Sequence, residues 1–304
     1  MTLGSPSHAV IGANDPGRMA DYLARFGFTE RREAPLPVPA ALALYGLDRE
    51  LREIELRAPG STTGTVRIIE TPLPVAERGP FAHGPALLDL YTRDIEASMA
   101  LAASGGEHRG PIVEYPVEGL GSVFEARAIG PEGLALGFVM SDDRRSSLLD
   151  RDATAMHSEA HAYVWTVSSI DESVGFWRAA GMHQLLDSTV ADPGISVFME
   201  LPRPGVAIRI VHLTDADEGP IRFELMECPA DSGVALDTLP LRPGLHVVGF
   251  SVGDVSEEIR TLARATWRST VDFENEIHGR ARAATGQGPG GVRFELWQES
   301  HDGR

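Results

Sequence analysis

Lysine is absent from this sequence. All 27 basic residues among its 304 residues are arginine. The absence excludes a Schiff-base lysine and the lysine-bearing phosphate loop of nucleotide hydrolases. An anionic group of a substrate would therefore have to be bound by arginine, histidine, backbone amides or a metal ion.

The sequence also has only one cysteine, and its net charge is strongly negative. The single cysteine, Cys228, excludes an internal disulfide and a cysteine-based zinc cluster. The formal net charge of -17 disfavours partners that carry phosphate backbones or anionic lipid. We therefore expect no nucleic-acid partner and no membrane partner, and we expect a small molecule as the substrate.

Long apolar runs are missing as well. No stretch approaches the roughly 18 consecutive apolar residues that a membrane span needs. The first ten residues, MTLGSPSHAV, lack the basic and apolar regions of a secretory signal. We expect a cytoplasmic protein that is a monomer or a homodimer.

What the sequence does contain is a fourfold repeat. Apolar residues stand four and seven positions after each of four starting points, which is the spacing of one helix face. The predicted helices begin at Pro16, Ile95, Ile170 and Val255. A short apolar segment that reads as a strand precedes each helix, and these segments begin at His8, Ala86, His161 and His246. Further strand-like runs follow, including ISVFMEL, so each module is expected to contain a strand, a helix and about three strands.

The third and fourth modules match most closely, because the sequence Arg-Phe-Glu-Leu at 222–225 recurs at 293–296. A polar, charged segment at 141–160 separates the second module from the third. Such segments are typical of domain boundaries. We therefore predict two domains of two modules each, at residues 1–148 and 149–304.

Four modules of this kind, with a histidine opening the first strand and a glutamate in the last, resemble the vicinal oxygen chelate superfamily. That superfamily includes glyoxalase-type lyases, extradiol dioxygenases, epimerases and bleomycin resistance proteins. The resemblance covers nearly the whole chain. It implies an α+β fold in which four βαβββ modules pair into two cup-shaped mixed-sheet domains, with a divalent metal ion inside a cup.

The resemblance also implies which residues hold the metal. The predicted ligands are His161, Glu224, His246 and Glu295, all in the C-terminal half. Two imidazoles and two carboxylates suit a first-row divalent ion such as Fe, Mn, Ni or Zn. The N-terminal pair is expected to be degenerate. Its second module has Ala86 and Gly137 at the ligand positions, and its first keeps His8 and, only with a shifted register, Glu70.

Residues that alternate with the predicted ligands along their strands are expected to line the substrate pocket. They are Tyr163, Trp165, Arg222, Phe250, Arg293 and Trp297. The two arginines could bind a carboxylate, but an outward orientation fits the sequence equally well. His212 is expected to pack rather than to face the pocket.

The segment from His278 to Glu295 resembles the extradiol dioxygenase signature. Pro289 and Gly291 match that pattern, whereas Thr285 replaces its tyrosine. His278 is therefore a candidate auxiliary catalytic residue.

Three functions remain open from the sequence. The favoured one is a glyoxalase-like lyase or isomerase, in which Glu224 or Glu295 leaves the metal and acts as the base in a proton transfer. An extradiol-type dioxygenase would instead use Fe(II) on the facial triad of His161, His246 and Glu295. A metal-free module would bind a planar or aromatic small molecule in an aromatic-lined cup.

Overall fold

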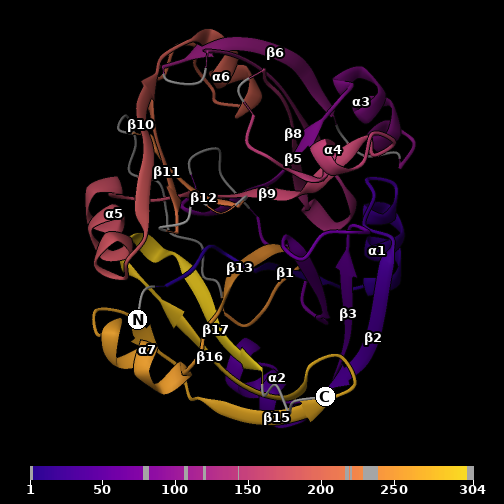
Figure 1. Cartoon of the computed structure of the whole chain (residues 1–304), viewed down its shortest axis with the longest axis vertical. Coiled ribbons are helices and arrows are strands. Elements are labelled where there is room, and N and C mark those ends of the chain that lie inside the picture. The colour runs from indigo at the N-terminus through magenta and orange to yellow at the C-terminus, as the bar shows by residue number, and fades with distance from the viewer. Residues whose placement is uncertain are drawn as a thin grey trace.

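The computed structural model describes residues 3–77, 82–105, 109–118, 121–142, 144–215, 219, 221–228 and 239–299. Figure 1 shows two curled sheets, one in the upper and one in the lower half of the view, with helices at their sides. Among the described residues, no helix has the length and apolar character needed to cross a membrane.

The four predicted helices are all present and begin at the predicted residues. They are α1 (Pro16–Ala24), α3 (Ile95–Ala103), α5 (Ile170–Ala179) and α7 (Val255–Thr261). In each case the side chain of the preceding residue accepts a hydrogen bond from a backbone N–H of the first turn. The capping residues are Asp15, Asp94, Ser169 and Asp254. These caps explain why the helices start where they do.

The strands follow the same repeat. The first strands of the modules are β1 (His8–Ala13), β5 (Gly84–Thr92), β9 (His157–Thr166) and β13 (Gly244–Ser251). The last strands are β4 (Thr65–Glu70), β8 (Ala135–Met140), β12 (Arg222–Glu227) and β17 (Arg293–Glu299). Between them lie β2 (Glu30–Leu36), β3 (Leu51–Arg57), β6 (Arg109–Val117), β7 (Gly121–Ile129), β10 (His183–Val190), β11 (Ile208–Thr214), β14 (Thr266–Trp267), β15 (Val271–Asn275) and β16 (Gly279–Gln287).

Short helices interrupt the strand order. They are α2 (Val38–Tyr45), α4 (Leu148–Arg151) and α6 (Pro193–Phe198), with 3-10 turns η1 (Pro131–Gly133) and η2 (Pro289–Gly291). The prediction of a strand for ISVFMEL is wrong, because its first four residues end α6. Asp192 caps this helix by accepting a hydrogen bond from the backbone N–H of Gly194 at 2.7 Å, and Pro193 suits its first position.

Each sheet combines a module from the N-terminal half with a module from the C-terminal half. The outer-module sheet, from the first and fourth modules, has the order β14-β16-β17-β13-β1-β4-β3-β2, with β15 paired to β16. The inner-module sheet, from the second and third modules, has the order β10-β11-β12-β9-β5-β8-β7-β6. The antiparallel pairs β1–β13 and β5–β9 join the modules.

This pairing corrects the predicted division of the chain, in which each cup belongs to one half. The sequence pattern of one module predicts that its first strand has an edge free to pair with another module. It does not predict which of the other three modules, whose first strands have similar edges, will be the partner. The α+β fold class, with four βαβββ modules forming two cup-shaped mixed sheets, is confirmed.

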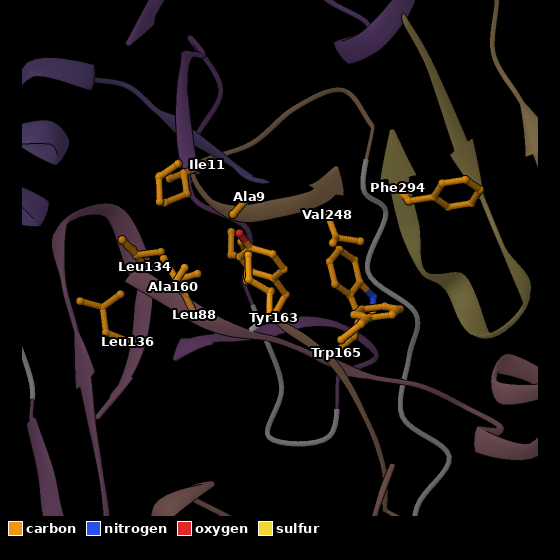
Figure 2. Close-up of a cluster of buried hydrophobic side chains, with 14 of the residues drawn as sticks. Ala9, Ile11, Leu88, Leu134, Leu136, Ala160, Tyr163, Trp165, Val248 and Phe294 are labelled. Atoms are coloured by element: carbon orange, nitrogen blue, oxygen red, sulfur yellow. The ribbon is translucent and has the colours of Figure 1, made fainter. Parts of the chain in front are cut away.

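The backs of the two sheets share one hydrophobic core. Figure 2 shows side chains of β1, β5, β9, β13 and β17 gathered between the sheets. Two smaller apolar clusters lie on the opposite faces, inside the cups, where α6 and α2 contribute side chains. We call the two hollows the inner-module cup and the outer-module cup.

Candidate active site in the inner-module cup

A pocket opens on the cup face of the inner-module sheet. It holds about 640 Å³ of space outside the protein atoms, counted to its open mouth. Its ionisable lining includes Asp89, Glu125, His161, His212, Arg222 and Glu224. Pockets of this size that combine apolar walls with a few polar groups are typical of small-molecule sites.

Strand alternation places these side chains. On β5, Leu87, Asp89 and Tyr91 face the pocket, while Leu88 and Leu90 lie in the core behind it. On β12, Arg222 and Glu224 face the pocket in the same way. Every second residue of a strand lies on the same face, so each strand delivers several groups to one hollow.

His161 reaches the pocket from β9, beside a shift in register between β5 and β9. Its ring stacks on Tyr91 with a centroid distance of 3.6 Å. Neither ring nitrogen has a hydrogen-bond partner in the described part of the chain. Burial, assisted by the positive charge of Arg222, lowers the pKa of His161 well below its usual value. The imidazole is therefore neutral and both nitrogens can bind a ligand.

Asp89 is a buried carboxyl group and Glu125 is a half-buried one. Burial raises the pKa of Asp89 well above its usual value, and the negative charges of Glu224 and Glu125 add to that effect. Burial also raises the pKa of Glu125 to about 8, against the opposing hydrogen bond from Tyr115. Oδ1 of Asp89 has no hydrogen-bond partner among the described residues. Both groups therefore keep a proton to a higher pH than an ordinary carboxyl group does.

Glu224 and His212 form a hydrogen-bonded pair. His212 Nε2 lies 2.9 Å from Glu224 Oε2, and Arg222 Nη1 lies 3.3 Å from His212 Nδ1. A guanidinium can only donate, so Nδ1 accepts and the imidazole proton is on Nε2, facing the carboxylate. Arg222 also donates to the hydroxyl of Tyr91 at 2.6 Å. His212 thus faces the pocket, against the prediction that it packs.

Gly137 has a physical role where the superfamily pattern has a glutamate. It pairs with Asp89 across β8 and β5, and a Cβ atom at Gly137 would lie 2.1 Å from Asp89 Oδ1. The carboxyl group of Asp89 therefore fills the space beside position 137. Sequence reasoning missed Asp89, although an acidic residue inside the apolar strand ALLDLYT was a visible signal.

The predicted metal ligands do not come together. His161 and Glu224 belong to the inner-module sheet, whereas His246 and Glu295 belong to the outer-module sheet. The facial triad of the dioxygenase hypothesis is divided in the same way. The physical reason is the pairing of modules across the two halves of the chain.

The substrate-contact predictions divide between three places. Tyr163, Trp165 and Phe250 are fully buried in the core between the sheets, where Figure 2 shows the first two. Arg222 lines the inner-module pocket. Arg293 and Trp297 lie on β17 of the other sheet, where both are buried. The prediction puts Tyr163, Trp165 and Phe250 on the wrong face, because the sequence does not specify which face of each strand turns towards the cup. Trp297 does line the outer-module cup.

The outer-module cup contains the remaining predicted residues. Glu295 lies 2.6 Å from His8 Nε2 and accepts hydrogen bonds from Arg67 and Tyr45. His278 Nε2 lies 2.9 Å from Glu53 Oε1. Glu70 lies at the end of β4 and pairs with Arg49, away from Glu295.

Neither cup fits the metal site that the resemblance implies. Within the described ranges, no three histidine, cysteine, aspartate or glutamate side chains are arranged to hold a metal ion. In the inner-module cup Glu224 is already paired with His212, and in the outer-module cup Glu295 is already paired with Arg67.

No family model and no curated protein matches this sequence. Solved structures do. Glyoxalase I from Zea mays is 16% identical, covers 97% of this chain and 92% of its own, and has a TM-score of 0.60. A mutant of that enzyme is 16% identical, with coverage of 97% and 93% and a TM-score of 0.64. A Bacillus subtilis protein provisionally named a dioxygenase is 11% identical, with coverage of 98% and 86% and a TM-score of 0.60. At these identities the likeness establishes the fold alone: this chain shares the fold of the glyoxalase I structures, as the sequence resemblance implied.

Proposed function

We propose that this chain is an enzyme that moves a proton on a small oxygenated substrate in the inner-module cup. One observation carries the proposal. The same pocket contains two carboxyl groups whose pKa is raised by burial, Asp89 and Glu125, and a third, Glu224, that accepts a hydrogen bond from His212. Titratable groups whose environments separate their protonation states are the usual acid and base of a proton transfer.

In this proposal Glu224 is the base. It removes a proton from the carbon next to a substrate carbonyl, and His212 keeps its carboxylate in place. Asp89 is the acid that returns a proton. The Arg222 guanidinium, whose Nε has no hydrogen-bond partner among the described residues, stabilises the negative oxygen that develops.

The protein groups named above provide every step of this proposal. A divalent metal ion would supply Lewis-acid stabilisation of the same oxygen, but the donor set of the predicted site is divided between two sheets. The favoured lyase or isomerase chemistry is thus retained with Glu224 as its base. Glu295 is left out because it lies in the other cup.

Deuterium exchange tests the proposal. The full chain is incubated in D₂O with a panel of small 2-oxo acids and hydroxyketones, and loss of the C–H signal beside the carbonyl is followed by NMR. We expect Glu224→Gln to slow exchange by roughly 10²- to 10⁴-fold. Glu50→Gln, on the exposed surface, serves as the matched control and should exchange at the wild-type rate. Equal rates in Glu224→Gln and wild type would exclude Glu224 as the base.

A second candidate function is binding without turnover. Its support is the apolar wall of the same pocket, to which Ile195 and Phe198 of α6 contribute. The exchange experiment separates the two. Saturable binding of panel members, with no exchange in any of them, would favour the binding function.

A further inference from the structure

The outer-module cup is built around a buried arginine. Arg67 lies on β4 and is 1% exposed. Its Nη1 donates to Oε1 of Glu295, and its Nε donates to Oε1 of Glu53 at 2.7 Å. Its guanidinium carbon lies 3.9 Å from the centre of the Trp297 ring. One cation therefore bridges two buried carboxylates.

Two histidines complete the arrangement. His8 Nε2 lies 2.6 Å from the same Oε1 of Glu295, and His278 Nε2 lies 2.9 Å from the same Oε1 of Glu53. Each of these carboxylate oxygens is thus shared between one imidazole and one nitrogen of Arg67. The second oxygen of Glu295 accepts from the hydroxyl of Tyr45 at 3.0 Å.

The donor types are those of a divalent-metal site. Two imidazoles and two carboxylates lie around Arg67, which contacts both carboxylates, and they come from β1, β3, β17 and the turn before β16. Two carboxylates that are 0% exposed require a cation, because unpaired buried charge is very costly. An arginine cannot lose its charge in a protein, so it can fill that role permanently. The salt bridges to Arg67 lower the pKa of Glu53 to about 2 and that of Glu295 below its usual value.

We propose that the Arg67 guanidinium takes the place of a divalent metal ion in the outer-module cup. The wild-type cup then binds no metal, because Arg67 already pairs with both carboxylates and occupies the space between them. Removal of the arginine side chain leaves His8, Glu53, His278 and Glu295 around a space, and creates a site for a divalent cation such as Zn(II) or Co(II). The proposal is independent of the function of the inner-module cup.

Metal-dependent rescue tests this proposal. Arg67→Ala is purified free of metal, and its melting temperature is measured with and without Zn(II). We expect the metal-free variant to melt well below the wild type and to gain roughly 5 °C or more with Zn(II), because a ligand that binds only the folded state stabilises it. Co(II) should bind in a 1:1 ratio and give the visible absorption of a nitrogen- and oxygen-ligated ion.

Controls separate the site from general effects. Arg67→Lys keeps a cation and should bind no Co(II) in the cup. The double variant Arg67→Ala, Glu295→Gln lacks one donor and should lose most of the rescue. Arg67→Met, which keeps more packing against Trp297, is measured alongside in case Arg67→Ala folds only when refolded with metal.

Two results would overturn the proposal. One is stoichiometric Co(II) binding by the wild type that is lost in Glu295→Gln, because the cup would then hold a metal together with Arg67. The other is failure of both Arg67→Ala and Arg67→Met to take up metal, whether folded or during refolding.

Discussion

At the residue scale, the inner-module cup holds carboxyl groups in an unfavourable setting for charge. Asp89 and Glu125 lie near Glu224, and burial together with the negative charge of Glu224 raises the pKa of both. Proteins retain such groups at functional sites more often than elsewhere. The cost is a dependence of stability on pH.

The raised pKa of Glu125 predicts how the free energy of unfolding changes with pH. Its pKa rises from an ordinary 4.5 to about 8 on folding. Between these two values the folded state keeps a proton that the unfolded chain has lost. Stability therefore falls as pH rises from about 4.5 to about 8, by up to ~1.4 kcal/mol per pH unit, and the effect ends once both states are ionised.

We expect Glu125→Gln to reduce this slope, because a neutral amide cannot ionise. At pH 8 the variant should be more stable than the wild type, by an amount on the order of 2 kcal/mol. Urea unfolding at a series of pH values measures the effect, with Glu50→Gln as the exposed control. Parallel pH profiles for wild type and Glu125→Gln would show that Glu125 is ionised in the folded protein.

At the element scale, strands β5 and β8 form a parallel pair in which a side chain of β5 fills the space left by a glycine of β8. Gly137 leaves room on β8, and Asp89 of β5 places its carboxyl group in that room. The two residues act as a unit. Changing the glycine alone should therefore be harmful, although alanine is ordinarily the better residue in regular structure.

We expect Gly137→Ala to cost about 1–3 kcal/mol, because its Cβ atom would overlap Asp89 Oδ1. Adding Asp89→Ala should restore most of the loss, and a double-mutant cycle measures the coupling. Gly175→Ala is the matched control. Gly175 lies on the exposed side of α5, and beyond the backbone of its own helix no atom lies within 4 Å of the position that a Cβ atom would take. This change should therefore stabilise the protein by up to ~1 kcal/mol. Additive effects of the Gly137 and Asp89 changes would show that the two residues are independent.

Elements with strong local signals were predictable from the sequence. The helix starts follow from apolar periodicity and from capping residues such as Asp15 and Ser169, both of which act over a few residues. The strand predicted at 195–201 fails for a local reason too. Its apolar run has the composition of a strand, but the helix start at Asp192 and Pro193 outweighs that composition.

At the scale of the whole molecule, the site could be predicted only in part. His161 and Glu224 do line one pocket, together with His212 from β11 of the same module. Asp89 and Glu125 join them from the second module, which the sequence pattern did not pair with the third. Side chains meet across a cup because of module pairing, which depends on contacts between residues far apart in the chain. The four modules have similar first strands, so the repeat pattern does not predict which module pairs with which.

The crossed pairing predicts how the chain responds to a cut. If the chain is divided between residues 145 and 146, ahead of α4, each half retains only half of each sheet. We expect neither fragment to unfold cooperatively alone, and we expect a mixture of the two to recover the fold. Circular dichroism and co-purification measure this. A cooperative transition in residues 146–304 alone would instead support the predicted C-terminal domain.

The order of the strands along the chain also determines which sheet can form first during synthesis. Residues 84–227 supply every strand of the inner-module sheet, so that cup can form as soon as they have left the ribosome. The outer-module sheet needs β1 and β13, and residues 14–243 separate those strands. At ordinary elongation rates the edge of β1 stays unpaired for roughly ten to fifty seconds. An unpaired strand edge is a site of aggregation, so the first module is the part of the nascent chain most in need of a chaperone.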